Sequence, residues 1–178
     1  MRPSMMRPGI HDRVSLRREA RQWRALIGLL GANLMAALIG SLASPTLSPR
    51  AAAWYAALRK PGWTPPDAIF GVVWPLLYVL SAVAAWQVWR RRHSHRAEVA
   101  LGFYFLQLAL NAAWSPVFFG LRSPGGALLL LLLLLATLGF TIRAFAGVRR
   151  SAAVMLAPYF AWVAFAGLLN LSIWWLNR

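Results

Sequence analysis

Aromatic and uncharged polar side chains recur at helical spacing within the apolar stretches of this chain. In the stretch 97–119, Tyr104, Gln107, Asn111 and Trp114 follow one another at steps of three or four residues. This spacing places all four on one face of an α-helix. Flat rings combined with a few hydrogen-bonding groups are typical of a small-molecule binding site. The face therefore predicts ligand binding rather than acid–base catalysis.

Two further stretches carry faces of the same kind. Trp74 and Tyr78 lie one turn apart in the second apolar stretch, and Tyr159, Trp162 and Asn170 share a face in the last one. If the three faces meet, they wall an aromatic cavity with amide and hydroxyl groups inside it. A structural interpretation stays open beside this one, because tryptophans also anchor helices at membrane surfaces and amides also join helices by hydrogen bonds. For Asn111, the structural and the ligand-binding roles are both retained.

The connector 54–66 between the first two apolar stretches is stiff and aromatic. Its three prolines fix the backbone and remove amide donors, so we expect a defined, non-helical shape. Trp63 offers a ring to a flat ligand, and Arg59 and Lys60 offer charges to a carboxylate. We expect this connector to act as a lid over the aromatic cavity.

Motifs for hydrolysis, phosphoryl transfer and metal chemistry are missing from the sequence. It contains no HExxH, no GxSxG, no phosphate-binding glycine loop and no cysteine. His93 and His95 lie in the basic run 90–96, which is typical of a loop beside a membrane rather than of a metal site. We expect no catalytic residue of the usual kinds, no metal and no required cofactor.

Composition predicts a helical membrane protein. Hydrophobic residues make up 60% of the 178 residues, charged residues only 13%, and the mean hydropathy is +0.55. A water-soluble domain of this size could not hide so much apolar surface. Five stretches are long enough to cross a bilayer as helices, namely 25–44, 69–89, 97–119, 126–146 and 152–176. The predicted fold is an all-α, five-helix transmembrane bundle, because a barrel would show shorter, alternating segments.

The positive charge is distributed as in a membrane protein, not as in a nucleic-acid-binding domain. Of nineteen Lys and Arg residues, fourteen lie on the side of the N-terminus and five on the other side. We therefore expect a multi-pass protein with a cytoplasmic N-terminus, lipid contacts and no nucleic-acid partner, the first loop and the C-terminus facing outward. Residues 1–24 are predicted to be a disordered basic tail, preceding one membrane domain at 25–178. A cleaved signal peptide over 1–44 is the weaker alternative.

Four separated motifs resemble the translocator protein (TspO/MBR) family, whose members are also called tryptophan-rich sensory proteins or peripheral-type benzodiazepine receptors. The motifs are Trp54-Tyr55-x-x-Leu58-x-Lys60-Pro61-x-Trp63-x-Pro65-Pro66, Trp74-x-x-Leu77-Tyr78, Asn111-x-x-Trp114-x-Pro116-Val117-Phe118-Phe119-Gly120 and Pro158-Tyr159-x-x-Trp162 with Asn170 following. They occur in the family's order and extend the resemblance over residues 25–177.

The resemblance implies a bacterial-membrane protein, often a homodimer, that binds protoporphyrin IX, haem, or sterol-like and benzodiazepine-type ligands under the first loop. The implied pocket residues are Trp63, Trp74, Tyr78, Asn111, Trp114 and Trp162. The animal members' cholesterol-recognition pattern places a tyrosine near the end of the fifth helix, where this chain has Trp174 and Trp175.

Two functions follow from these expectations. In the first, the protein is a receptor or carrier that takes part in tetrapyrrole regulation or transport, with Arg59 or Lys60 pairing with ligand carboxylates. In the second, the same pocket degrades porphyrin with light and oxygen, and Trp74 and Trp162 react with the excited pigment. Such photochemistry needs no acid–base pair and would leave no motif, so the sequence leaves an enzymatic role open.

Overall fold

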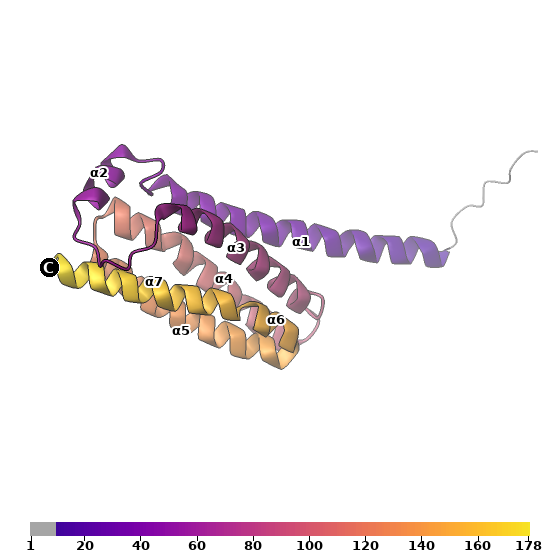
Figure 1. The fold of residues 1–178 in the computed structure, drawn as a ribbon. Coiled ribbons are helices and arrows are strands. Elements are labelled where there is room, and N and C mark those ends of the chain that lie inside the picture. Colours follow the sequence, from indigo (N-terminus) through magenta and orange to yellow (C-terminus); the bar gives the residue numbers. More distant parts are fainter. Residues whose placement is uncertain (1–9) are drawn as a thin grey trace, which may run out of the picture.

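The computed structural model describes the backbone of residues 10–178 and the side chains of residues 17–178, and in this part every regular element is a helix. Five long helices lie side by side as a bundle, and the short α2 lies across one end of it (Figure 1). The elements in chain order are α1 (Ile10–Leu42), α2 (Pro49–Ala57), α3 (Asp67–Trp89), α4 (His95–Ser115), the π-helical turn η1 (Pro116–Gly120), α5 (Pro124–Val148), α6 (Arg150–Met155) and α7 (Ala157–Leu176). The predicted helical membrane bundle is confirmed.

Four segments of the described part are long and apolar enough to cross a membrane: Arg17–Leu42, Asp67–Trp89, Pro124–Val148 and Arg150–Leu176. The fifth expected span, 97–119, corresponds to α4 and η1, and it is not among these four strongly apolar segments. Its first turn is charged, and the polar residues Gln107 and Asn111 are buried inside the bundle. The lower hydropathy of α4 therefore comes from the polar face that it buries inside the bundle, while Phe105 and Leu106 on its other face are exposed.

Helix α1 is longer than predicted. Residues 10–24, expected to be part of a disordered tail, continue the helix of the apolar span, while residues 1–9 of that tail lie outside the described residues. Arg, Ala, Leu, Glu and Gln are good helix formers, and extending an existing helix avoids the cost of nucleation. The basic segment therefore forms a helical extension beyond the bundle (Figure 1).

Prolines interrupt two of the expected spans. The stretch 152–176 is divided into α6 and α7 at Leu156, because Pro158 has no amide hydrogen and its ring clashes with a continuous helix. The stretch 97–119 changes from α- to π-helix at Pro116 for the same reason. Pro75 is accommodated inside α3.

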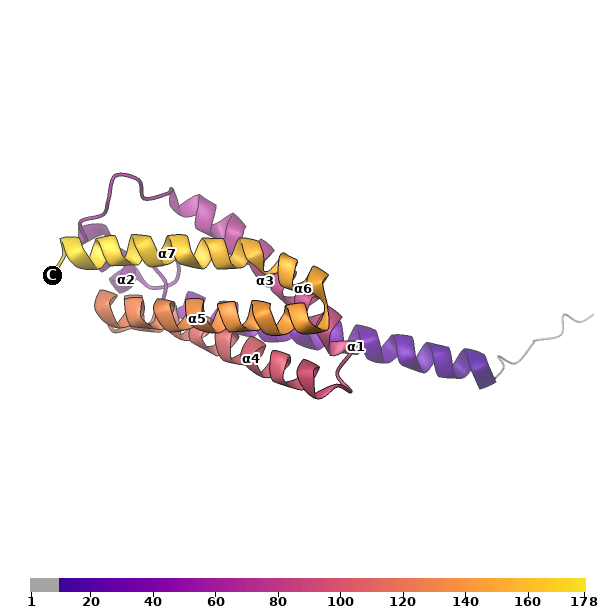
Figure 2. The same ribbon diagram turned by 90° about the horizontal axis from the view of Figure 1, so that it is seen from below.

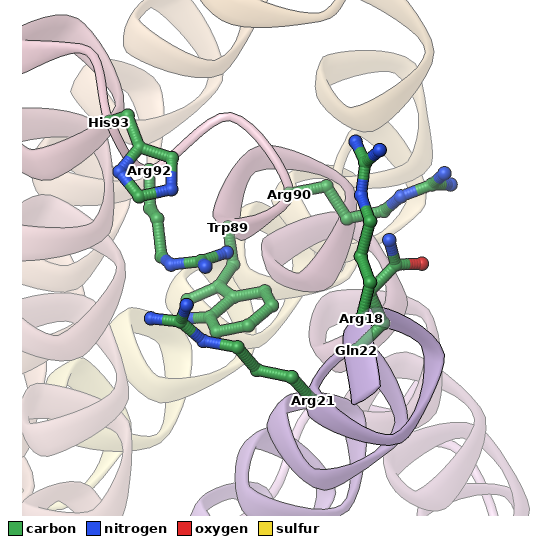
Figure 3. Close-up of a pocket in the computed structure, with 7 residues that line it drawn as sticks. All are labelled: Arg18, Arg21, Gln22, Trp89, Arg90, Arg92 and His93. Carbon is green, nitrogen blue, oxygen red and sulfur yellow. The ribbon is translucent and has the colours of Figure 1, made fainter. Parts of the chain in front are cut away.

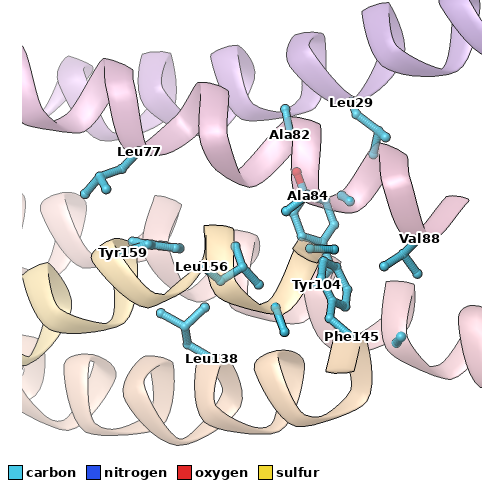
Figure 4. Close-up of a cluster of buried hydrophobic side chains, with 14 of the residues drawn as sticks. Leu29, Leu77, Ala82, Ala84, Val88, Tyr104, Leu138, Phe145, Leu156 and Tyr159 are labelled. Atoms are coloured by element: carbon cyan, nitrogen blue, oxygen red, sulfur yellow. The ribbon is translucent and has the colours of Figure 1, made fainter. Parts of the chain in front are cut away.

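Small residues of α3 and α4 lie in the core of the bundle, where α4 packs most extensively against α5. Ala82 and Ala84 of α3 are fully buried in the main hydrophobic cluster (Figure 4). Ala100 of α4 is fully buried in the same cluster. Tyr104 of α4 lies in the same cluster, stacks on Phe145 of α5 at 6.3 Å, and accepts a hydrogen bond from the amide of Asn33 in α1. These contacts fix the framework on which α3 and α7 present their aromatic faces.

Candidate functional site

Helices α3 and α7 approach each other near α6 and separate toward α2 in both views (Figures 1 and 2). Aromatic side chains fill the space between them. We call this group the aromatic layer, and its members are Phe70, Trp74 and Tyr78 of α3 and Tyr159, Trp162 and Phe165 of α7. The layer combines two of the three faces that the sequence predicts.

The rings of the aromatic layer touch each other across the two helices. Trp162 lies 5.5 Å from Phe70 and 5.4 Å from Phe165, measured between ring centroids. Trp74 lies 5.7 Å from Tyr78 and 6.2 Å from Tyr159. Each such pair contributes about 0.5–1.5 kcal/mol beyond its buried area. A flat ligand would enter by separating the rings of α3 from those of α7 and replacing ring–ring contacts with ring–ligand contacts.

Asn111 of α4 joins the two sides of the layer. The Tyr78 hydroxyl donates to Asn111 Oδ1 at 2.6 Å, and Asn111 Nδ2 donates to the Tyr159 hydroxyl at 2.6 Å. The structural role foreseen for Asn111 is therefore present, and its ligand-binding role stays a prediction. Because the Tyr159 oxygen acts as the acceptor here, its own hydrogen remains available to another acceptor.

Two predicted site residues have buried polar atoms without a hydrogen-bond partner among the described residues. These atoms are the indole nitrogen of Trp162 and both amide heteroatoms of Gln107, whose side chain is fully buried. An unpaired polar group in the interior costs about 1–3 kcal/mol. Such groups are uncommon in folded proteins, and a ligand that supplies a partner would recover this cost.

Trp114 belongs to a neighbouring group of rings rather than to the contacts of the aromatic layer. Its ring stacks on Phe118 at 5.1 Å, and its indole nitrogen donates to Asn170 Oδ1 at 3.1 Å. Asn170 Nδ2 in turn donates to the backbone oxygen of Pro124 at 2.7 Å. Trp114 thus helps to hold α4, α7 and the start of α5 together, and its expected contact with a ligand stays a prediction.

The connector 54–66 is only partly as predicted. Its first four residues belong to α2, which begins after the N-cap Ser48 and is rich in alanine, so the expectation of a wholly non-helical segment is wrong there. Trp54 and Tyr55 pack edge-on against Phe118 and Phe119, each at 5.5 Å. Beyond α2 the chain forms no further helix until α3, because the prolines interrupt it.

Three predicted ligand contacts lie in the rest of this connector. Trp63, with 49% of its surface exposed, lies 5.7 Å from Phe165 and extends the aromatic layer toward the loop. Lys60 is engaged by the protein: its ammonium group donates to the Tyr55 carbonyl at 2.7 Å and lies 4.4 Å from the centre of the Tyr55 ring. Burial, together with the charge of Asp67, raises the pKa of Tyr55 and keeps this ring neutral. Arg59 is exposed and is the better placed cation for a carboxylate.

Asn177 fastens the connector to the end of α7. Its side-chain oxygen accepts from the Arg59 amide at 2.9 Å, and its nitrogen donates to the Arg59 carbonyl at 2.8 Å. We expect Asn177→Ala to free this segment and to speed tryptic cleavage after Arg59 several-fold, as measured by mass spectrometry of the fragments. Ser172→Ala, which removes only a bond within α7, is the matched control. Equal cleavage of the two variants would contradict a latch at Asn177.

An open apolar hollow of about 500 Å³ lies on the outer side of α7, away from the contacts of the aromatic layer. Its lining residues are Pro61, Leu171, Ser172, Trp175 and Leu176. None of the nine predicted ligand contacts lines this hollow. Its wall nevertheless includes Pro61, so it adjoins the connector 54–66.

Two residues with structural contacts were not predicted from the sequence. Phe165 follows Trp162 by three residues, and the helical spacing would have included it in the same face. Asn33 is the polar partner of Tyr104 on α1, and no second polar residue one turn away in α1 marks its face.

Comparison with known proteins places similar sequences across animals and bacteria. The family model described as the TspO/MBR family matches residues 29–176. The chain is 40% identical over 151 residues to the translocator protein of Bos taurus, covering 84% of this chain and 89% of that protein. It is 40% identical over 126 residues to protein CrtK of Rhodobacter capsulatus, which covers 70% of this chain and 79% of that protein. It is 38% identical over 140 residues to the tryptophan-rich protein TspO of Chlorobaculum tepidum, which covers 76% of this chain and 87% of that protein.

Proposed function

Since this chain belongs to the TspO/MBR family of membrane proteins, we propose that it is a receptor or carrier that binds protoporphyrin IX, haem or a related flat amphipathic ligand in the aromatic layer. The role would lie in tetrapyrrole regulation or transport. The ligand is held between the rings of α3 and α7, with Trp63 and the connector above it.

The unpaired indole N–H of Trp162, within the ring contacts of the aromatic layer, is the observation that carries this proposal. It offers a buried donor where the layer otherwise presents ring faces and edges. A tetrapyrrole combines an extended flat ring, nitrogen and carboxylate acceptors, and two propionates at one edge. The rings supply stacking, Trp162 and the Tyr159 hydroxyl supply donors, and Arg59 supplies a cation at the loop.

The remaining arrangement follows from charge and from the family resemblance. We propose that the N-terminal face, with fourteen of the nineteen cations, is cytoplasmic, so that the connector and the C-terminus face outward. We also propose a homodimer. Gly28 and Gly31 of α1 have open space where a side chain would lie, which leaves room for a second copy beside this helix.

Light- and oxygen-dependent degradation of porphyrin is the second candidate function. The observation that favours it is the position of Trp74 and Trp162 in one layer, with Trp74 in contact with the rings of Tyr78 and Tyr159. Indole and phenol rings are among the protein groups that an excited porphyrin and oxygen oxidise. No acid–base pair is required for this reaction.

A titration followed by illumination separates the two functions. The purified chain in detergent is titrated with protoporphyrin IX in the dark, and then the complex is exposed to light in air. A receptor or carrier should show saturable quenching of tryptophan fluorescence and a Soret band that survives illumination. A degrading protein should lose the Soret band and form a new product faster than free porphyrin does. Failure to saturate at micromolar porphyrin in the dark would contradict both functions.

A further inference from the structure

A basic hollow of about 280 Å³ lies far from the aromatic layer, at the end of the bundle where α3 turns into α4 (Figure 3). Its walls come from α1 and from the end of α3 with the following turn. The lining residues are Arg18, Arg21, Gln22, Trp89, Arg90, Arg92 and His93. Four guanidinium groups therefore surround a space of molecular size, and the proposed porphyrin site uses none of them.

These arginines lack carboxylate partners within the described part of the chain. The one ion pair found there joins His95 and Glu98 at 3.8 Å, outside the hollow. Partial burial, and after it the nearby charge of Arg21, lower the pKa of Arg92, as expected where like charges lie close together. An anion between them would relieve this repulsion.

Tryptophans hold the walls of the hollow in place. The guanidinium of Arg92 lies 3.9 Å from the centre of the Trp89 ring, and that of Arg90 lies 5.0 Å from the Trp86 ring. The Trp86 indole nitrogen donates to the backbone oxygen of Gln22 at 3.0 Å and thereby ties α3 to α1. Stacking leaves the edges of a guanidinium free to donate hydrogen bonds, so two of the cations are oriented before an anion arrives.

The hollow lies where two candidate membrane spans end. Segment Asp67–Trp89 finishes at its wall, and segment Arg17–Leu42 begins there. Just beyond the hollow, α1 presents Trp23 and Ile27, which are 60% and 67% exposed. This placement puts the arginines at the depth of lipid head groups and an apolar helix surface at the depth of acyl chains.

We propose that this hollow binds the phosphate group of an anionic phospholipid, with Arg21 and Arg92 as its main contacts. Guanidinium groups match phosphate oxygens in pairs of hydrogen bonds, and basic pockets between membrane helices bind anionic head groups in this way. The site is independent of porphyrin binding. Bound lipid joins α1, the helix with the long basic extension, to the α3–α4 turn.

Native mass spectrometry of the full chain in detergent tests the proposal with dioctanoyl phosphatidylglycerol as the probe. Dioctanoyl phosphatidylcholine has the same acyl chains without net charge, and inorganic phosphate has the anion without acyl chains. We expect the chain to retain phosphatidylglycerol in preference to both. Arg21→Gln combined with Arg92→Gln should weaken its binding by about 20- to 30-fold, since each arginine near a membrane surface contributes about fivefold.

The matched control is Arg149→Gln combined with Arg150→Gln, which removes two charges from another turn at the same end of the bundle. We expect this pair to change lipid binding by less than about threefold, since screening weakens charges outside the hollow. Arg18→Gln combined with Arg90→Gln repeats the test on the other two arginines, should the first pair fold poorly.

Three outcomes would overturn the proposal. Equal losses of phosphatidylglycerol binding in the test and control pairs would show that only the general surface charge attracts the lipid. Full displacement of the lipid by inorganic phosphate would show a site for soluble anions. Displacement by protoporphyrin IX would make the hollow a porphyrin site, whereas failure of porphyrin to bind anywhere would leave the lipid site intact.

Discussion

Replacing Trp74 and Trp162 together with leucine should weaken protoporphyrin IX binding by about 10- to 100-fold. Each ring contributes about 0.5–1.5 kcal/mol of stacking beyond its area, and a factor of ten corresponds to about 1.4 kcal/mol. Replacing Trp162 also removes its unpaired buried indole N–H, which is a hydrogen-bond donor. Dark titration followed through the Soret band measures the loss directly, without relying on tryptophan fluorescence.

The control for this pair removes two tryptophans from elsewhere. Trp23 and Trp174 are 60% and 37% exposed and make no ring contact with the aromatic layer. We expect their double replacement with leucine to leave porphyrin affinity within about threefold of the original. Equal losses of porphyrin affinity in both double variants would mean that porphyrin associates with apolar surface in general. That result would contradict the assignment of the site to the aromatic layer.

Asn111→Ala should destabilise the bundle by about 1–3 kcal/mol. The change removes the bonds to Tyr78 and Tyr159 and leaves two hydroxyl groups without their amide partner. Hydrogen bonds between membrane helices contribute about 0.6–1.7 kcal/mol each, so the loss of two accounts for this range. Unfolding in increasing dodecyl sulfate measures the change in free energy.

Thr137→Val is the matched control for Asn111→Ala. Its hydroxyl donates only to the Leu133 carbonyl in its own helix, at 2.8 Å, and joins no two helices. We expect a change below about 0.5 kcal/mol there. If both variants unfolded alike, Asn111 would have no special role in joining α4 to α3 and α7.

The five long helices could be located from the sequence because a bilayer imposes a fixed length of apolar helix. The helical faces could be predicted too, since the spacing of Trp74 and Tyr78, or of Tyr159 and Trp162, fixes their direction on a helix. The structure brings the rings of Trp74, Tyr78 and Tyr159 into contact, and it places Trp162 of α7 against Phe70 of α3. Pairing of α3 with α7 could not be read from spacing, because spacing within one helix says nothing about which helices are neighbours.

Differences from the sequence predictions arise where local and tertiary effects compete. Helix α1 extends back to Ile10 because the basic segment has good helix formers and adjoins a stable helix. Trp114 turned out to pair with Asn170 across the bundle, although it shares a helix face with Asn111. The basic hollow could not be predicted, because its walls come from segments almost seventy residues apart in the sequence. Each segment alone has the cluster of cations that is ordinary at the cytoplasmic end of a membrane helix.

Protection of single cysteines gives the most direct test of porphyrin binding between α3 and α7. The chain has no cysteine of its own, so each introduced thiol reports alone. One cysteine replaces Ala166, which is partly buried on α7 one turn after Trp162. The other replaces Leu168, which is on the same helix and is 60% exposed. The rate of N-ethylmaleimide labelling is measured for both in detergent, with and without saturating protoporphyrin IX in the dark. Binding in the aromatic layer predicts at least about tenfold slower labelling at position 166 and no change at position 168. Equal labelling rates at 166 with and without bound porphyrin would contradict it.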